Sequence, residues 1–177
     1  RVFQNIGKYL DEPNGDRSMI PTFIVSEFAK KKVTVILSGD GADELFGGYP
    51  RYWMLQNKIL QNRKTLSPFN VLELYLEYFL PVYKISALKN IFPEMYHRFI
   101  KKFSRHFINE QRSISASIRS LDFETYLTCV LSKVDMMSMK SSLEVRTPFL
   151  NKDIIEFSQS VPENLIWNGE LPKVVLR

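Results

Sequence analysis

The clearest secondary-structure signal lies in residues 16–37, where a helical pattern is followed by a strand pattern. Four apolar residues recur at the spacing of one helix face: Ile20, Phe23, Ile24 and Phe28. Ser18 or Asp16 can cap this helix, and Lys30–Lys32 supply the positive charge that its end favours. Val33–Leu37 (VTVIL) is then a short, β-branched, continuously apolar run, typical of a strand buried on both faces of a parallel sheet. The two elements predict an α/β crossover.

After Pro50 the apolar pattern is helical, and no second convincing strand is found. Five segments carry this periodicity, with breaks at prolines: Tyr52–Leu60, Pro68–Phe79, Pro93–Phe107, Phe123–Met139 and Lys152–Ser160. The predicted fold class is therefore α/β, with residues 1–49 as a helix–strand–loop part and residues 50–177 as a mostly helical part. One strand cannot form a sheet, so further strands are expected from sequence beyond this chain, from Arg1–Leu10 or from a partner.

Composition narrows the class of protein. The 177 residues are 45% hydrophobic and 24% charged, which excludes a disordered, collagenous or membrane-embedded chain. No run approaches the ~18 apolar residues of a membrane span, and no signal-peptide pattern opens the chain, so a cytoplasmic location is expected. The single cysteine, Cys129, excludes a disulfide framework and lies in a helical pattern, where we expect a buried, inert thiol.

The net charge of +5 suits anionic ligands without indicating a DNA-binding arm. Residues 97–119 mix basic and aromatic side chains, a pattern that also occurs in nucleic-acid and membrane-surface helices. However, Phe99, Phe103 and Phe107 repeat every four residues, which favours a core stripe with a solvated basic face. Met136, Met137 and Met139 are likewise expected to fill the core. No nucleic-acid or membrane partner is expected, and a homo-oligomer stays open.

The segment Ser38–Glu44 (SGDGADE) is the first place to expect chemistry, because ligands of open α/β sheets lie at the carboxyl ends of the strands. Its glycines permit a sharp turn whose amides can approach phosphate oxygens. Asp43, with Asp40 or Glu44, can hold Mg²⁺ beside such phosphates. A tight turn with acidic residues capping the next helix remains an equal alternative. A dinucleotide-binding motif does not fit this segment, because the third glycine of G-x-G-x-x-G is missing. A calcium-binding EF-hand does not fit either, because the spacing of its acidic residues is absent.

Taken as a whole, the string SGDGADELFGGYPRY resembles the synthetase domain of asparagine synthetases, in the ATP-pyrophosphatase superfamily. Upstream, DEPNGDRSMIPTF is similar to the family's DEP turn and the helix after it. Downstream, KVDMMSMKSSLEVRTPFL and the closing LPKVVLR match two further blocks in the same order. These blocks cover about half the chain and bracket nearly all of it.

The resemblance implies an ATP-dependent amidotransferase that uses Mg²⁺. Such an enzyme adenylates the side-chain carboxylate of aspartate, and ammonia from a separate glutaminase domain then displaces AMP to give asparagine. Carried over by position, Ser38, Gly39 and Gly41 belong to the nucleotide site, and Asp43 matches the Mg²⁺ carboxylate. The resemblance also places Asp40 near the acyl-adenylate. Lys173 matches a lysine that reaches phosphate oxygens, although an ordinary exposed lysine is an equal alternative.

Parts of the family's machinery have no match here. The S-G-G-x-D-S phosphate loop, a downstream lysine and the glutaminase cysteine are absent, so we expect a fragment that is inactive alone. Relatives often show Pro-Asp where this chain has Leu127-Thr128-Cys129. This departure keeps a relative that amidates another carboxylate open, and a non-catalytic binding module is the alternative from a different class. Glu144 and Arg146 are expected to form an ion pair that fixes the turn before Pro148.

Overall fold

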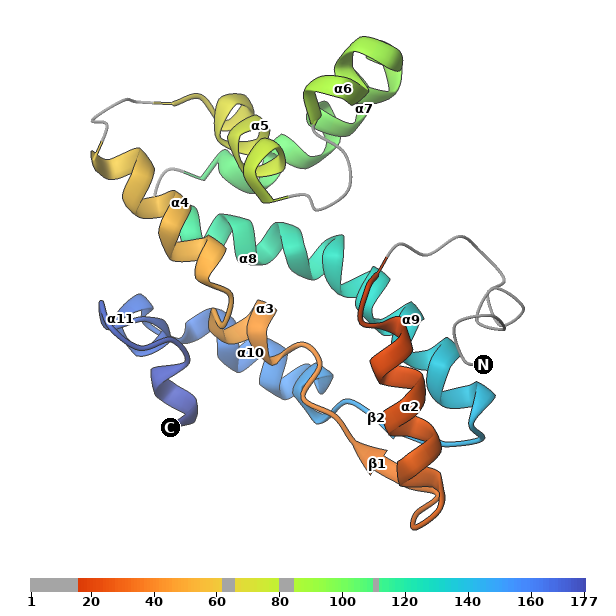
Figure 1. Cartoon of the computed structure of the whole chain (residues 1–177). Coiled ribbons are helices and arrows are strands. Elements are labelled where there is room, and N and C mark those ends of the chain that lie inside the picture. The colour runs from red at the N-terminus through yellow and green to blue at the C-terminus, as the bar shows by residue number, and fades with distance from the viewer. Residues whose placement is uncertain (1–15, 62–65, 80–84, 110–111) are drawn as a thin grey trace. The chain divides into compact units, whose positions relative to one another are not determined.

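The computed structural model describes residues 16–61, 66–79, 85–109 and 112–177 (Figure 1). They fall into two compact units. We call the first the strand unit; it holds the described residues up to Ala42 together with Glu124–Ser160. The second, the helical unit, holds the described residues of Asp43–Phe123 and Val161–Arg177. The contribution of Arg1–Leu10 to the sheet, left open above, lies outside the described residues.

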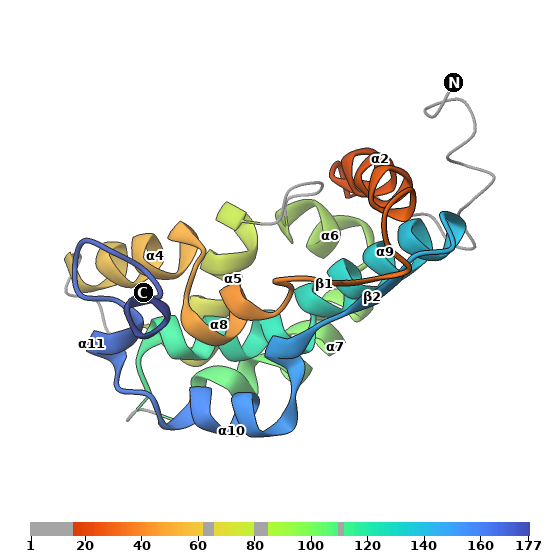
Figure 2. The same cartoon turned by 90° about the horizontal axis from the view of Figure 1, so that it is seen from below.

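The strand unit contains a two-stranded parallel sheet, which confirms the α/β class. β1 (Val35–Leu37) pairs with β2 (Glu144–Arg146) so that Val35 lies opposite Glu144 and Leu37 opposite Arg146 (Figure 2). The presence of β2 corrects the expectation that no strand follows Pro50. Its three residues offer a single apolar side chain, so the sequence there contains no apolar run that could indicate a strand.

The predicted burial of the first strand is wrong within the described residues. β1 is shorter than the apolar run that predicts it, and Leu37 is 72% exposed, with Val33 and Val35 also exposed. An apolar run shows that a strand is able to be buried on both faces. It becomes buried only where other elements pack against both of those faces. Cys129 is also exposed, which corrects the expectation of a buried thiol.

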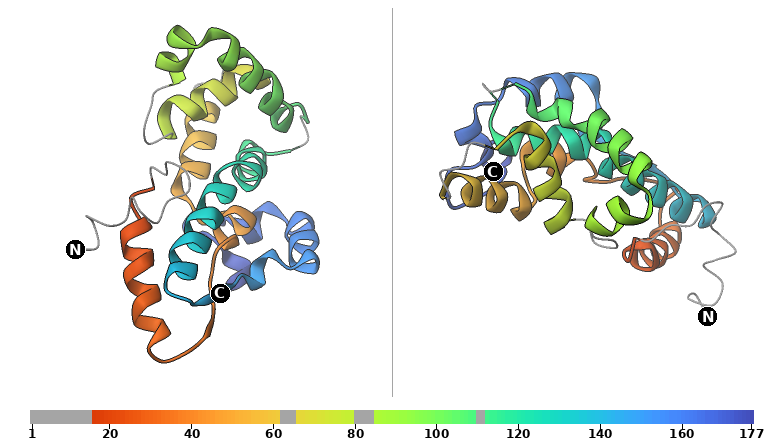
Figure 3. Two further views of the ribbon diagram at one scale, coloured as in Figure 1. Left: turned by 90° about the vertical axis from the view of Figure 1, so that its right-hand side faces the viewer. Right: turned by 90° about the horizontal axis from the view of Figure 1, so that it is seen from above.

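Helices α2 (Met19–Lys30) and α9 (Tyr126–Lys140) lie side by side (Figures 1 and 3). Their shared core consists of Met19, Phe23 and Met137, with Met136 packed against it. Phe23 thus faces inward as predicted, but Ile24 is exposed and Phe28 is 68% exposed. The predicted core role is confirmed for Met137 and wrong for Met139, which is exposed.

A buried lysine ties α9 to the residues that precede α2. The Lys133 ammonium donates a hydrogen bond to Ser18 Oγ at 2.7 Å and lies 3.0 Å from Asp16 Oδ2. Asp16 Oδ1 also accepts hydrogen bonds from the Ser18 amide and hydroxyl. Burial alone would raise the pKa of Asp16, but the bonds from Ser18 and Lys133 outweigh burial and hold it below its ordinary value. Ser18 occupies the N-cap position of α2 without capping it through its side chain.

The remaining segments of the strand unit match their predictions closely. α10 (Lys152–Ser160) has the expected bounds and follows the short 3₁₀ helix η3 (Pro148–Leu150). Glu144 and Arg146 form the expected ion pair, with 2.7 Å between Oε1 and Nε, and both side chains are exposed. None of the helices among the described residues has both the length and the apolarity that a bilayer span requires.

The helical unit is built from short helices joined by turns. They are α3 (Ala42–Phe46), α4 (Pro50–Gln61), α5 (Pro68–Phe79), α6 (Ile85–Ile91), α7 (Pro93–Phe103), η2 (Ser104–Phe107), α8 (Ile114–Glu124), α11 (Glu163–Ile166) and η4 (Val174–Leu176). Proline opens α4, α5 and α7, as expected for a residue that suits the first helical position. The predicted helix Phe123–Met139 is two helices, because α8 ends at Glu124 and α9 starts at Tyr126.

We expect Lys133→Met to destabilise the strand unit by about 1–3 kcal/mol at neutral pH, because it removes the buried charged hydrogen bond and the ion pair. The lowered pKa of Asp16 stabilises the fold fully above its unfolded value of about 4, and this contribution disappears as pH falls through the folded value. The variant should therefore lose less stability on acidification than the parent. Thermal unfolding of the complete protein between about pH 7 and pH 3 measures both effects; equal acid sensitivity would contradict the argument.

Candidate functional site

The loop after β1 is fixed at its start by local hydrogen bonds. The Ser38 amide donates to the Arg146 carbonyl at 2.8 Å, which continues the pairing of β1 with β2. The Ser38 hydroxyl donates to Asp40 Oδ2 at 2.7 Å, so the structure brings these two predicted site residues together. All three residues belong to the strand unit. A serine hydroxyl held by a carboxylate gives the turn a defined shape before any ligand is considered.

The two glycines of the loop differ in what surrounds them. Gly39 has open space where a side chain would project, so the backbone there is accessible to a ligand. Gly41 has φ +90°, a conformation that favours glycine, and a side chain there would overlap Leu150. The sharp turn expected of the glycines is therefore required at Gly41, whereas close approach of a ligand is feasible at Gly39.

Asp43 begins the helical unit and lies in the first turn of α3, beside a lysine distant in sequence. The distance between Asp43 Oδ1 and Lys173 Nζ is 2.6 Å, and the two side chains are 34% and 30% exposed. The structure thus brings together a predicted Mg²⁺ carboxylate and a predicted phosphate-binding lysine, although nothing in the sequence indicated their contact. Both charges remain accessible to solvent, as a polyphosphate site requires.

Glycine at position 48 makes this contact sterically feasible. A side chain there would overlap both Asp43 Oδ1 and Lys173 Cε. Lys173 itself has φ +56°, a left-handed conformation that costs a lysine roughly 1–2 kcal/mol. The turn before it is held by an isolated bridge between Trp167 and Pro172, and Trp167 stacks on Trp53 with ring centroids 5.0 Å apart. Such local strain persists only where the surroundings hold it, and it occurs often at functional sites.

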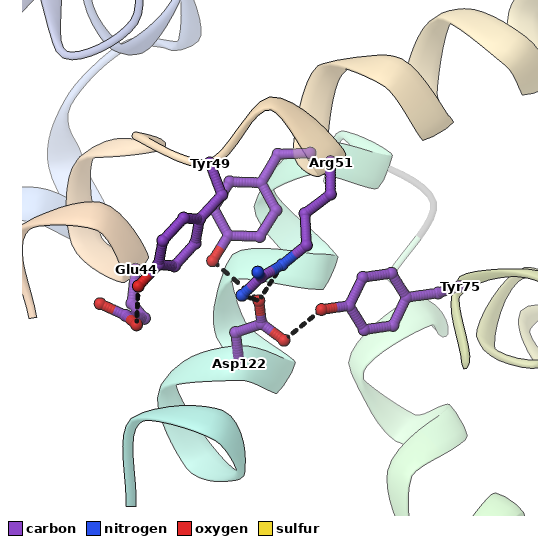
Figure 4. Close-up of polar contacts among 6 residues, drawn as sticks. Glu44, Tyr49, Arg51, Tyr75 and Asp122 are labelled. Carbon is purple, nitrogen blue, oxygen red and sulfur yellow. Dashed lines mark hydrogen bonds and ion pairs between the residues drawn. The ribbon is translucent and has the colours of Figure 1, made fainter. Parts of the chain in front are cut away.

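The residue after Asp43 points into the protein. Glu44 is 2% exposed and accepts a hydrogen bond from the Tyr49 hydroxyl at 3.0 Å (Figure 4). Burial raises the pKa of Glu44, while its hydrogen bonds, including that from Tyr49, work in the opposite direction. The acidic pair is therefore divided: Asp43 faces accessible space and Glu44 anchors α3.

A buried carboxylate on α8 organises the residues that follow. Asp122 Oδ2 accepts bonds from Arg51 Nη2 at 2.6 Å, Arg51 Nε at 3.0 Å and the Tyr52 hydroxyl at 2.9 Å. Tyr75 donates to Oδ1 at 2.5 Å from the opposite side (Figure 4). Burial alone would lower the pKa of Arg51, but Asp122, Tyr75 and Tyr52 together raise it above its ordinary value. Burial first and then Asp122 raise the pKa values of Tyr52 and Tyr75.

Sequence reasoning missed this cluster. The sequence offered one sign of it: Asp122 lies on the same side of its helix as Ile118 and Leu121, and that side is buried. A second missed residue is Arg119, whose Nη1 donates to the Leu45 carbonyl at 2.6 Å while Nη2 pairs with Glu163 at 3.3 Å. Arg119 thereby binds the end of α3.

The donor set can be tested against Mg²⁺. The described residues contain no group of three His, Cys, Asp or Glu side chains that could hold a metal ion by themselves. Mg²⁺ beside a polyphosphate needs less, because one or two carboxylates suffice when phosphate and water oxygens complete the octahedron. Asp43, half-buried and next to a lysine that can contact phosphate, fits that second arrangement.

Comparison with known proteins agrees with the resemblance noted in the sequence. The family model described as asparagine synthase matches residues 1–177. Asparagine synthetase [glutamine-hydrolyzing] 1 of Bacillus subtilis (strain 168) is 30% identical over 96% of this chain. A provisionally named asparagine synthetase [glutamine-hydrolyzing] of Mycobacterium tuberculosis (strain ATCC 25618 / H37Rv) is 28% identical over the same share. The chain spans 31% and 30% of the lengths of these relatives. No solved structure matches the chain significantly.

We expect Asp122→Asn to destabilise the helical unit by about 3–5 kcal/mol, because the largely buried guanidinium of Arg51 would lose its ion pair with Asp122. Arg51→Met should be similarly costly. The double variant should cost less than the sum of the two by about 1–3 kcal/mol, because the second change removes a group whose ion pair the first change already broke.

Thermal unfolding of the complete protein measures this coupling. The exposed Glu144–Arg146 pair is the control, since the coupling between Glu144→Gln and Arg146→Met should stay below about 1 kcal/mol. Additive losses at Arg51 and Asp122 would show that the buried pair does not act as one unit.

Proposed function

The chain belongs to the asparagine synthase family, and on this basis we propose that it forms part of an ATP-dependent amidotransferase that makes asparagine. A carboxylate oxygen of aspartate attacks the α-phosphorus of ATP, the bond to pyrophosphate breaks, and an acyl-adenylate forms. Ammonia then attacks the acyl carbon, AMP leaves with the C–O bonding pair, and the amide remains after loss of a proton. The names of the relatives specify glutamine hydrolysis and so support glutamine as the source of ammonia.

The observation that carries this proposal is the contact between Asp43 and Lys173 at the start of a helix that follows a parallel strand. We assign Asp43 as the carboxylate that holds Mg²⁺ and Lys173 as a ligand of phosphate oxygens. A bound Mg²⁺ would supply charge neutralisation for the departing pyrophosphate. One carboxylate and one ammonium, both accessible, are the complementary charges that a metal-bound polyphosphate requires.

The loop residues take the remaining roles. We propose that Ser38, Gly39 and Gly41 line the nucleotide site, with the open space at Gly39 giving the backbone access to it. Asp40 lies next to Ser38 through their hydrogen bond and is assigned to the region of the acyl-adenylate. Catalysis of this kind depends chiefly on positioning and on balancing phosphate charge, and the chain supplies groups for both.

One observation favours a second candidate function. The segment Leu127-Thr128-Cys129 has no carboxylate, and the Thr128 hydroxyl donates to the Glu124 carbonyl at 3.2 Å. If relatives use a carboxylate here to recognise aspartate, this chain would act on another carboxylate substrate. ATP–pyrophosphate exchange with aspartate and with other carboxylates separates the two candidates, and absence of both exchange and MgATP binding would instead support a non-catalytic module.

The decisive variant is Asp43→Asn in the complete protein, which keeps the size of the side chain and removes its charge. We expect ATP–pyrophosphate exchange to fall by about 10²-fold or more and the Mg²⁺ midpoint to rise, because the lost contact stabilises the transition state. The matched control is Asp153→Asn, which changes an exposed acid in the first turn of α10 and should leave both quantities unchanged.

Two outcomes complete the experiment. The isolated 177-residue chain should show no exchange, since it spans about a third of its relatives. If Asp43→Asn preserves both the exchange rate and the Mg²⁺ midpoint, Asp43 does no more than favour the first turn of α3, as the alternative interpretation of this loop holds.

A further inference from the structure

Helix α3 carries Asp43 but is too short to fix its own direction. It has five residues, whereas isolated helices shorter than about 12 residues are unstable in water. Its geometry must therefore be imposed by contacts with the rest of the helical unit. These contacts are polar at both ends of the helix: Glu44 near its start and the Leu45 carbonyl near its end.

The contacts at Glu44 continue through the partly exposed Tyr49 and Arg51 to the buried Asp122 (Figure 4). Glu44 accepts the Tyr49 hydroxyl bond at 3.0 Å, and the Arg51 guanidinium lies over the Tyr49 ring, with 4.0 Å between Cζ and the ring centroid. Arg51 is in turn held by two hydrogen bonds to Asp122, which is 2% exposed. The path from α8 to the start of α3 thus consists of three direct contacts.

We propose that Arg51, held by Asp122, is a positioning residue that sets the Asp43 carboxylate through Tyr49 and Glu44. This inference rests on the proposed function, because it assigns a consequence to the placement of Asp43. Arg51 touches neither substrate nor metal in this account and acts only through the two residues between.

The chemistry of the chain suits this role. A guanidinium over an aromatic face is attracted to the ring, so it holds Tyr49 in place. It also withdraws electron density from the phenol, which makes the hydroxyl a better donor to a buried carboxylate. Because Glu44 and Asp43 are consecutive on one turn, a loosened Glu44 lets Asp43 shift, and a shift of about 1 Å at a reacting group can cost about 10²-fold in rate.

The experiment uses Tyr49→Phe in the complete protein, since this variant removes one hydroxyl and keeps the ring beneath Arg51. Two controls separate positioning from general stability. Tyr96→Phe removes a buried hydroxyl that has no hydrogen-bond partner among the described residues, and Ile100→Val trims a fully buried side chain of the same unit. Each variant is measured for MgATP affinity by calorimetry, for the Mg²⁺ midpoint of ATP–pyrophosphate exchange and for thermal unfolding.

We expect Tyr49→Phe to weaken MgATP binding and to raise the Mg²⁺ midpoint, each by about tenfold, beyond any effect of its lowered unfolding temperature. Ile100→Val should lower the unfolding temperature without moving the midpoint, and Tyr96→Phe should change neither. Arg51→Lys keeps the charge beside Asp122 but loses the planar group over Tyr49, so it should raise the midpoint in the same direction. If Tyr49→Phe does not fold, Arg51→Lys alone decides the matter.

Asp43→Asn, measured in parallel, separates failure of this inference from failure of the proposed function. If Asp43→Asn moves the midpoint while Tyr49→Phe and Arg51→Lys behave like Ile100→Val, the positioning role is overturned and the function stands. If Asp43→Asn leaves the midpoint unchanged, the assignment of Asp43 to Mg²⁺ fails, and the positioning role fails with it. The proposed function itself fails only if the parent protein shows neither exchange nor MgATP binding.

Discussion

The buried carboxylate of Asp122 is the interaction on which the helical unit depends most. Removing a charged carboxylate from water costs several kcal/mol, so its burial requires a full set of donors in good geometry. Arg51 supplies two of them, and Tyr52 and Tyr75 supply one each. This requirement ties α4 and α5 to α8 and fixes the residues that connect α3 to α4.

Fixing that connection matters because the proposed chemistry lies on a helix of only five residues. α3 is held at its start by Glu44 and at its end by Arg119, and both ties come from residues on or anchored to α8. Contacts with the core of the unit therefore position Asp43, while its carboxylate and Lys173 stay accessible. Stability and function thus meet in α3, because the groups that stabilise the helical unit also place the carboxylate assigned to Mg²⁺.

Local signals in the sequence predicted the elements that depend on local physics. The bounds of α5 and α10 follow from prolines and helical periodicity, and the first strand was placed correctly at its carboxyl end. Features that depend on distant partners were not predicted. β2 has a single apolar residue, and Asp122 can be buried only because Arg51 and two tyrosines donate hydrogen bonds to it. The exposure of Leu37 likewise depends on neighbouring layers and not on its own strand. Among the candidate site residues, the glycines and acidic residues of the loop stood out by their chemistry and Lys173 by resemblance, whereas the contact of Asp43 with Lys173 needed the structure.

The most direct test of the central claim is a structure of the complete protein with Mg²⁺ and a non-hydrolysable ATP analogue. The account predicts that Asp43 coordinates the metal and that Lys173 leaves Asp43 for a phosphate oxygen. It also predicts that the contacts of Glu44 with Tyr49 and of Arg51 with Asp122 stay as they are. A structure in which Asp43 remains paired with Lys173 while other residues hold the metal would contradict it.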